Sequence, residues 1–240
     1  FFNLQITEGD WDGALTTHKK INKIKKMDKE TFNKGESILL FQKAKELRSE
    51  GKTLEALKIS RQALKKYPSL VPNSIFLSDL ELLEGQKKRA EAALLNTWKA
   101  IPHPDIAKKF AEIEKKESVD ARIERFKKIL NVKKTDTETK ILKAELNILS
   151  ENFPEARRSI IDLIETDKAN VKVYTLMAAI EKGAGSSDAV VKGWLAKAVT
   201  AKRSKTWICS NCDSQSDWVP VCKKCGEFST LEWKEEIYEN

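Results

Sequence analysis

The sequence predicts an all-α chain, a solenoid of stacked helical hairpins followed by a small module built around four cysteines. Three observations lead to this fold class. A short turn-and-helix signature recurs with an offset of 34 residues, and a fixed period of this length indicates stacked hairpins. Only nine Gly and six Pro occur among 240 residues, while Lys, Glu, Ala and Leu dominate, which favours helices. All four cysteines lie close together near the C-terminal end.

The repeated signature is clearest in the first half of the chain. Gly51–Ala56 reads GKTLEA, and Gly85–Ala90 reads GQKKRA 34 residues later. The same offset separates Pro68 from Pro102. Further copies of the signature are Gly9–Ala14 (GDWDGA) and Glu151–Ala156 (ENFPEA). We therefore expect about six hairpins within residues 1–203, the first of them truncated because the sequence starts in mid-pattern, as in a piece of a longer protein.

Each repeat has the marks of two helices joined by a tight turn. A Gly or another turn residue ends the first helix, and a proline such as Pro68 or Pro102 ends the second. Apolar and small residues fall on one face of the second helix. In the first clear copy these residues are Ala56, Leu57, Ser60, Ala63, Leu64 and Tyr67. Such a face must be covered by a neighbouring hairpin, so the hairpins are expected to stack.

The four cysteines form two C-x-x-C pairs separated by nine residues. Each pair can direct two thiolates at one ion, and two pairs complete a tetrahedral site with no open position for water. The spacing favours structural zinc, rubredoxin-like iron is the alternative, and a disulfide or redox role would require an oxidising compartment. We expect a metal-binding module over residues 207–240, after a basic linker at Ala201–Thr206. The ligands are Cys209, Cys212, Cys222 and Cys225.

Residues around the cysteines support a small metal-held module. The residue after the second cysteine of a pair often needs a positive φ, which Gly226 adopts freely and Asp213 tolerates. A module of this size cannot bury a standard core, so the metal and nearby aromatic rings must stabilise it. These aromatic residues are Trp207, Trp218, Phe228 and Trp233. We interpret most of them as packing residues.

The net charge of +8 is unevenly distributed along the chain. Residues 207–240 hold three Lys and seven Asp or Glu, a net charge of −4, which leaves +12 on residues 1–206. A basic body suits an acidic partner, although lysines on the solvated faces of many helices explain the same sum. The negative charge of the module disfavours nucleic-acid binding. Opposite charges and the need to cover apolar rings predict that the module docks on the last repeat near Trp194.

The sequence contains no motif that indicates an enzyme. It lacks phosphate-binding glycine loops, a nucleophile elbow and the H-E-x-x-H zinc motif. His18 lies within a repeat and His103 in a turn; a lone turn histidine is interpreted as a capping or surface residue, and neither histidine is expected to be a haem ligand. No apolar run approaches the roughly 18 residues needed to cross a bilayer. This chain is therefore expected to reach a membrane only through segments outside it.

The period of 34 residues, with these Gly, Ala and Pro positions, resembles the tetratricopeptide repeat. Other segments resemble the HemY-type proteins of alphaproteobacteria, in which two hydrophobic segments precede the repeats. The matching segments are Gly9–Leu15, Leu70–Pro72, Pro102–Ala107, Met177–Glu181, Trp194–Ala198, Trp218–Cys222 and Leu231–Lys234. The resemblance implies a membrane-tethered scaffold or regulator linked to haem and porphyrin biosynthesis at the bacterial inner membrane. Four free thiolates favour the reducing, cytoplasmic face of that membrane.

A second family has a similar architecture. It is the membrane-tethered adaptor that regulates lipopolysaccharide assembly, which also joins such repeats to a terminal rubredoxin-like module. The segments Trp218–Cys222 (WVPVC) and Leu231–Lys234 (LEWK) are more similar to the HemY-type proteins. Two alternatives to the haem-linked role therefore remain, an adaptor of lipopolysaccharide assembly or another envelope pathway, and a rubredoxin-like iron protein that transfers electrons.

The leading prediction is a non-enzymatic scaffold that binds other proteins, such as enzymes of haem synthesis. Side chains on the first helix of each hairpin would line a concave groove for these partners. By repeat position the candidate groove residues are Phe41, Lys45, Arg48, Ile75, Asp79, Leu82, Ile141, Glu145, Ile148 and Tyr174. Their alternative interpretation is ordinary packing between repeats.

Overall fold

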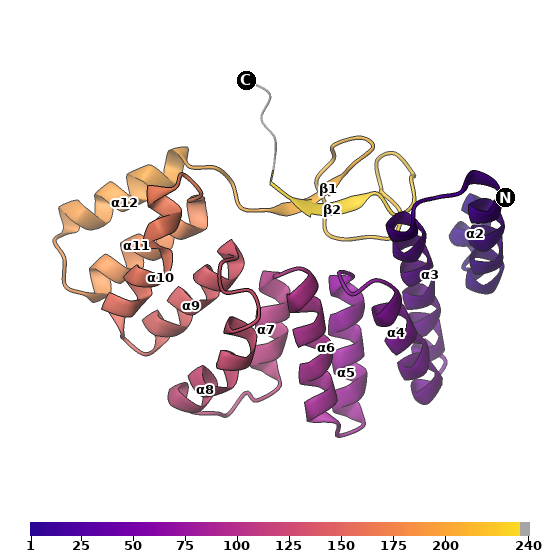
Figure 1. The fold of residues 1–240 in the computed structure, drawn as a ribbon, viewed down its shortest axis with the longest axis horizontal. Coiled ribbons are helices and arrows are strands. Elements are labelled where there is room, and N and C mark those ends of the chain that lie inside the picture. Colours follow the sequence, from indigo (N-terminus) through magenta and orange to yellow (C-terminus); the bar gives the residue numbers. More distant parts are fainter. Residues whose placement is uncertain (236–240) are drawn as a thin grey trace. The chain divides into compact units, whose positions relative to one another are not determined.

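The structure is a computed structural model, and it describes residues 1–235 (Figure 1). The chain forms two compact units. The first unit contains residues 1–101, 108–113 and 207–232, and the second contains residues 102–107, 114–206 and the chain from 233 onward. Residues 236–240, the last five of the expected metal module, lie outside the described residues.

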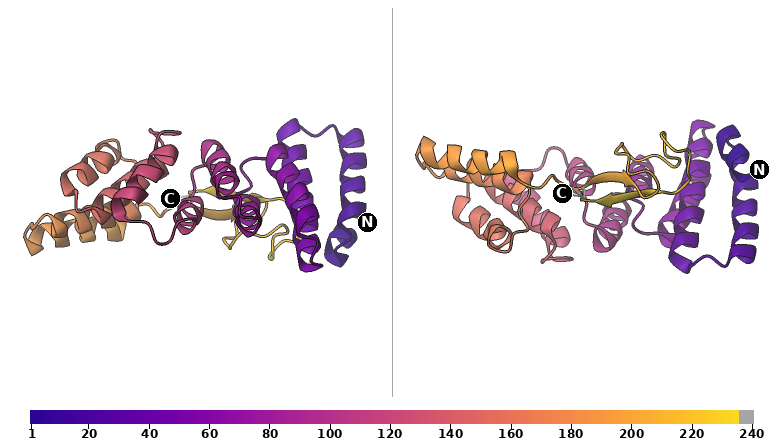
Figure 2. Two further views of the ribbon diagram at one scale, coloured as in Figure 1. Left: turned by 90° about the horizontal axis from the view of Figure 1, so that it is seen from below. Right: turned by 90° about the horizontal axis from the view of Figure 1, so that it is seen from above.

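The described residues form twelve helices and one two-stranded sheet, as the predicted all-α repeat fold with a small terminal module requires. The helices are α1 (Phe2–Glu8), α2 (Trp11–Lys25), α3 (Lys29–Ser49), α4 (Thr53–Lys66), α5 (Val71–Leu83), α6 (Lys87–Ala100), α7 (Pro104–Glu112), α8 (Val119–Leu130), α9 (Thr137–Leu149), α10 (Phe153–Glu165), α11 (Val171–Gly183) and α12 (Asp188–Thr200). The strands are β1 (Thr206–Cys209) and β2 (Leu231–Lys234). Consecutive helices pack together as hairpins within each unit, for example α3 with α4 and α11 with α12. In the first unit α2 also lies beside α3, as both views of Figure 2 show.

The turn inside each hairpin has the left-handed residue that the signature predicts. Gly51 has φ 81° and Gly85 has φ 70°, and the N–H of the residue after each turn glycine bonds back to a carbonyl in the last turn of the helix. Glu151 occupies the same place in the hairpin of α9 and α10 with φ 57°. In this conformation the Cβ atom of a residue other than glycine lies too close to the following carbonyl oxygen, so the backbone at Glu151 is strained.

The prolines end the second helices as predicted. Helix α4 ends before Pro68 and α6 ends before Pro102. The intervening residues are extended in the same way, with φ −142° and ψ 90° at Tyr67 and φ −145° and ψ 104° at Ile101. Proline excludes helical geometry at the residue before it, which explains this repeated ending.

The core of the first unit lies between consecutive hairpins. The predicted face of α4 is buried from Ala56 to Leu64, and Tyr67 at its end is half-buried. This face packs against residues contributed by α3, α5 and α6. These residues are Leu47, Leu77, Leu80 and Ala93. The predicted amphipathic pattern is therefore confirmed.

An arginine–glutamate pair ties neighbouring hairpins together in both units. Arg61 of α4 donates two hydrogen bonds to Glu81 of α5, at 2.7 and 2.8 Å. Arg157 of α10 donates a hydrogen bond to Oε1 of Glu181 on α11. The glutamate side chains are only 3% and 5% exposed, so each carboxylate depends on its arginine for compensation.

The core of the second unit is formed mainly by α9, α10 and α11. Its buried residues include Ile141, Ala144, Ala156, Ile160, Leu163, Val173, Met177 and Ile180. The ring of Tyr174 stacks on Trp194 of α12, with 6.2 Å between centroids. The expected linker is tied down at its start, because the carbonyl of Lys202 accepts a hydrogen bond from the N–H of Val171.

Within residues 1–235, every helix is too short or too polar to span a lipid bilayer.

Candidate metal centre

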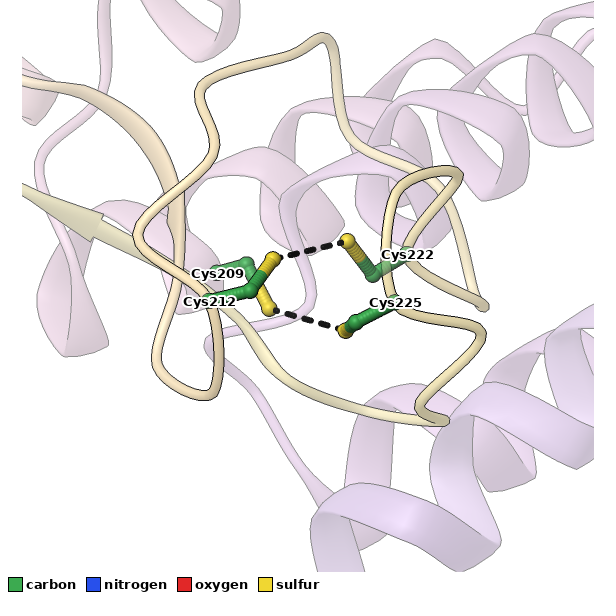
Figure 3. Close-up of side chains that lie close together, drawn as sticks. All are labelled: Cys209, Cys212, Cys222 and Cys225. Carbon is green, nitrogen blue, oxygen red and sulfur yellow. Dashed lines mark hydrogen bonds between the residues drawn. The ribbon is translucent and has the colours of Figure 1, made fainter.

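The two C-x-x-C pairs converge on one point in the first unit (Figure 3). The sulfur atoms of the four cysteines all lie within 4.8 Å of one another. Sγ of Cys209 lies 3.7 Å from Sγ of Cys225, and Sγ of Cys212 lies 3.7 Å from Sγ of Cys222. Each close contact joins one pair to the other, so both pairs face the same central position. The predicted convergence of the four thiols is confirmed.

Each pair sits in the same type of turn. The N–H of Asp213 donates to the carbonyl of Cys209, and the N–H of Gly226 donates to the carbonyl of Cys222, both at 2.9 Å. Asp213 has φ 54° and Gly226 has φ 74°, which confirms the predicted positive φ after the second cysteine of each pair. Residues outside the turns then pair across them, Ile208 with Gln215 and Val221 with Phe228. The module is thus two similar knuckles framed by β1 and β2.

Polar groups surround the sulfur atoms. Oγ of Ser214 lies 3.2 Å from Sγ of Cys212 and 3.3 Å from Sγ of Cys222. Oγ1 of Thr230 lies 3.2 Å from Sγ of Cys209. The N–H of Asn211 donates to the same sulfur at 3.4 Å. At Cys209 and Cys222 these contacts lower the pKa and favour the thiolate, which is the form that binds metal ions.

The pKa of Cys222 shows this effect most clearly. The hydrogen bond from Ser214, followed by backbone N–H groups of the second knuckle, lowers its pKa to about 6. The pKa of Cys209 is also lowered; burial opposes the change, but the Thr230 hydroxyl and backbone N–H groups outweigh it. Sequence reasoning missed Ser214 and Thr230, because only the folded knuckles bring their hydroxyls to the sulfurs.

The geometry fits a tetrahedral metal ion. Bonds of about 2.3 Å from zinc to sulfur require sulfur–sulfur edges of about 3.8 Å in a regular tetrahedron. The two measured close edges are 3.7 Å. Cys209 and Cys222 are buried, and the other two cysteines are partly exposed. Four thiolates would complete the coordination shell, so the arrangement suits a structural ion and leaves no position for substrate or water.

The aromatic residues of the module have different roles. Trp207 and Trp218 pack on a cluster formed by Cys209, Cys222 and Leu231. Phe228 packs instead on helices of the first unit. Trp233 belongs to the second unit, where its ring lies 4.0 Å from that of His103.

The module docks on the first helices of the chain. Phe228 and Val221 pack against a cluster of Ile6, Ala14 and Leu39. The ring of Phe228 meets Phe2 edge-on, with 5.4 Å between centroids. Residues from opposite ends of the sequence therefore form a continuous apolar contact.

Trp218 makes the second part of this contact. Its ring lies 5.8 Å from that of Phe41 on α3, and Phe41 in turn meets Phe76 of α5 at 5.6 Å. Trp218 and Phe228 both pack on the cluster that contains Ile38, Phe41 and Leu70.

The predicted docking partner of the module is wrong. We expected its apolar rings to pack near Trp194, but Val221 and Phe228 pack on α1, α2 and α3. Trp194 already has other neighbours, because Tyr174 stacks on its ring and the ammonium of Lys197 lies 4.4 Å from the ring centroid. The first hairpins offer a larger set of apolar and aromatic side chains, which explains the choice.

Both histidines have structural surroundings. Nε2 of His18 lies 3.0 Å from the carbonyl oxygen of Phe32, and the two rings stack with 4.9 Å between centroids. Nδ1 of His103 accepts a hydrogen bond from the N–H of Asp105 at the start of α7. Burial lowers the pKa of His103 to about 4, although the carboxylate of Asp105 opposes the change. His103 thus caps the start of α7, as one of the two expected roles requires, but both histidines are buried and neither is a surface residue.

The candidate groove residues fall into two sets, one in each unit. In the first unit Phe41 lies under the module, and Lys45 lies beside it with its ammonium 5.5 Å from the ring centroid. Arg48 bonds Thr53, and Asp79 pairs with Lys109. Ile75 and Leu82 are half-buried on α5.

The second set lies on α9 and α11. Ile141 is a buried core residue, and Ile148 and Tyr174 pack against the same cluster. Glu145 pairs with Lys172 at 2.9 Å. Glu145, Ile148 and Tyr174 are partly exposed, and the role of these residues in a partner groove stays a prediction.

Comparisons with known proteins give only distant similarities. No family model matches the chain. Over 237 residues the chain is 21% identical to the probable magnetosome protein Mms48 of Magnetospirillum gryphiswaldense. The match covers 98% of this chain and 53% of that protein, so the chain spans about half the length of this curated relative.

Two solved structures are distantly similar to this chain. A tetratricopeptide repeat protein from Parabacteroides merdae is 18% identical with a TM-score of 0.41, and the match covers 82% of this chain and 75% of that one. YrrB, a tetratricopeptide repeat protein with an unusual peptide-binding site, is 15% identical with a TM-score of 0.40, and the match covers 76% of this chain and 90% of that one. The hairpins and their period of 34 residues are themselves those of a tetratricopeptide-like fold.

Proposed function

We propose that this chain is a non-enzymatic scaffold for protein partners, and that a structural zinc ion holds residues 207–232 as a module on its first helices. The observation that carries the proposal is the set of four cysteine sulfurs within 4.8 Å of one another, in a part of the chain that packs on α1, α2 and α3. Helical hairpins of this kind leave side-chain surfaces that suit extended partners.

Zinc suits the site better than iron for a structural role. Four thiolates in two knuckles bind either metal, so geometry alone does not separate them. Zinc has no redox chemistry and stabilises the fold of small modules directly. A rubredoxin-like iron site that transfers electrons is the second candidate, and it is distinguished by colour, since iron–thiolate absorbs visible light and zinc does not.

The cellular setting is proposed from similarity. The resemblance to HemY-type proteins supports a scaffold at the cytoplasmic face of the bacterial inner membrane that organises enzymes of haem synthesis, tethered by segments outside this chain. The architecture shared with the lipopolysaccharide-assembly adaptor supports an envelope pathway as the alternative. The similarity to a probable magnetosome protein adds the magnetosome as a third setting.

A pair of variants tests the role of the metal module in partner binding. Cys222→Ser removes one metal ligand. The control, Lys223→Ser, also introduces a serine, but at an exposed position of the same knuckle that binds no metal. Both variants and the unaltered chain are crosslinked to their neighbours in native membranes, and the captured proteins are identified. The proposal expects the same partners for the unaltered chain and Lys223→Ser, and a changed set for Cys222→Ser.

The same variants test how the parts of the chain depend on one another. Cys222→Ser should lose the bound metal and unfold the module while most of the far-UV circular dichroism of the helices remains, because repeats depend mainly on their neighbours. Identical partners for all three proteins would contradict a role of the module in binding. Loss of the whole helical signal would contradict the local role of the metal.

A further inference from the structure

The module presents three apolar side chains on one outer face. Val221 and Phe228 are paired across the second knuckle, where the N–H of Ser229 also donates to the carbonyl of Pro220 at 2.9 Å. Trp218 lies four residues before Cys222 and packs on the cysteine cluster as well as on Phe41. The knuckle around Cys222 and Cys225 therefore sets the positions of all three side chains, and a metal ion at the sulfurs would set the knuckle.

The surface that receives them is formed by the first hairpins. We call it the docking face and define it by the buried residues that the module's side chains pack on. They are Ile6, Ala14, Ile38, Leu39, Phe41 and Leu70. The face has two parts, an aromatic part around Phe41 and Phe76 and an aliphatic part around Ile6 and Leu39. Phe41, which belongs to this face, is also one of the groove residues predicted from the sequence.

Two lysines beside the docking face, Lys34 and Lys45, carry positive charge, and Glu232 of the module is attracted to one of them. Lys34 on α3 is half-buried and is attracted by the carboxylates of Glu232 and Glu30. The exposed Lys45 lies beside the Phe41 ring. The module thus brings an aromatic ring, Trp218, to Phe41 and a carboxylate, Glu232, to Lys34, and a partner segment with an aromatic and an acidic residue offers the same two groups.

We propose that the docking face is a binding surface for a peptide segment that carries an aromatic and an acidic residue, and that the metal module occupies this surface as an internal competitor. The inference rests on the proposed scaffold function and names the chemistry of one partner. Because the module and the face belong to one chain, the module competes at an effective concentration on the order of millimolar. A partner segment binds only when it displaces the module or when the module is released.

Release is coupled to the metal. The three contact side chains lie on or beside the knuckle that holds Cys222 and Cys225. Removal of the ion unfolds such a knuckle, since metal binding supplies most of its folding free energy. Val221 and Phe228 then lose their common orientation, and the docking face becomes accessible.

The test compares three forms of the full chain in selection from a peptide library displayed on phage. The undocked variant, Trp218→Ala with Phe228→Ala, keeps the cysteines but loses two contact rings. A triple variant adds Phe41→Ala, which removes the aromatic part of the docking face. Metal content and far-UV circular dichroism are measured first, so a missing metal site is detected separately from a failure of peptide binding. The unaltered chain treated with a metal chelator gives a second route to the open face if the undocked variant does not fold.

We expect peptides with an aromatic and an acidic residue to be enriched at least about tenfold on the undocked variant relative to the unaltered metal-loaded chain. The same peptides should be lost, by a similar factor, from the triple variant. The inference is overturned if the metal-loaded unaltered chain captures them equally well, if capture survives Phe41→Ala, or if no such peptides are enriched. A dimer of the undocked variant that exchanges modules between copies would also overturn it, because the occupant would then be a second copy.

Discussion

The indole ring of Trp218 lies against the ring of Phe41, with 5.8 Å between centroids and 47° between the ring planes. Trp218 belongs to the cysteine module, whereas Phe41 lies on α3 in the first half of the chain. This contact makes the metal module part of the packing of the first hairpins. It explains why residues 207–232 and 1–101 belong to one compact unit.

The contact should be measurable as a coupling energy. Aromatic pairs contribute about 0.5–1.5 kcal/mol beyond the area that they bury. A double-mutant cycle with Phe41→Ala and Trp218→Ala, followed by denaturant unfolding, should therefore give a coupling of about 1 kcal/mol. A matched cycle with Phe41→Ala and Tyr174→Ala, whose rings belong to different clusters, should be additive within about 0.5 kcal/mol. Additivity in both cycles would show that the module does not dock on Phe41.

Ser214 should strengthen metal binding. Its hydroxyl lies 3.2 Å from Sγ of Cys212 and 3.3 Å from Sγ of Cys222, one ligand from each knuckle. Loss of an outer hydrogen bond of this kind typically weakens metal affinity by about tenfold or more. Competition with a chromophoric chelator should show this loss for Ser214→Ala. Ser216→Ala, whose hydroxyl donates to the carbonyl of Asp217, should bind metal like the unaltered chain; equal affinities for all three proteins would refute the role of Ser214.

A glycine in the turn between α9 and α10 should stabilise the folded protein. Glu151 in this turn has φ 57°. The equivalent residue in the turn between α3 and α4 is Gly51, with φ 81°. Glycine removes a steric cost of roughly 1–2 kcal/mol but loses more conformational entropy on folding, so Glu151→Gly should raise the free energy of unfolding by about 1 kcal/mol. The mirror change Gly51→Glu should lower it, and a Cβ at that position meets no other atom within 4 Å. Calorimetry that finds the opposite signs would show that the turn carries no strain.

His103 should make the protein sensitive to acid. Burial lowers its pKa to about 4, against about 6.5 in an unfolded chain, so the unfolded state binds more protons between these two values. The stability contribution is complete above pH 6.5 and falls as the pH drops toward 4, by at most a few kcal/mol. Replacement by asparagine keeps an acceptor for the N–H of Asp105 without a titrating ring. Unfolding measured from pH 7 to pH 4.5 should depend less on pH in His103→Asn, and parallel curves would contradict the shifted pKa.

The sequence predicted those features that depend on local chemistry. The period of 34 residues identified the hairpins, and Pro68 and Pro102 marked the helix ends. The cysteine spacing identified the four converging thiols, and the positive φ at Asp213 and Gly226 followed from the needs of a knuckle. Each of these depends on residues that are near one another in sequence.

The docking of the module could not be predicted in the same way. Val221 and Phe228 form a common apolar face only after the knuckle has folded and paired them. Before that, the apolar residues near Trp194 and those near Phe41 are equally plausible partners by composition. In the structure Phe41 and Phe76 form an aromatic site between α3 and α5, and Trp218 of the module packs on Phe41. Long-range packing of this kind has no periodic signal in the sequence.

The measurement that tests the central claim most directly is X-ray absorption at the metal edge of the purified, reduced chain, together with its metal content. We predict about one zinc ion per chain with four sulfur neighbours at about 2.3 Å, in a colourless protein. Iron with the same four sulfur neighbours would instead support the second candidate, a rubredoxin-like site that transfers electrons. A metal-free protein with disulfides between the cysteines, prepared under reducing conditions, would contradict the account that a metal ion holds the module on the first helices.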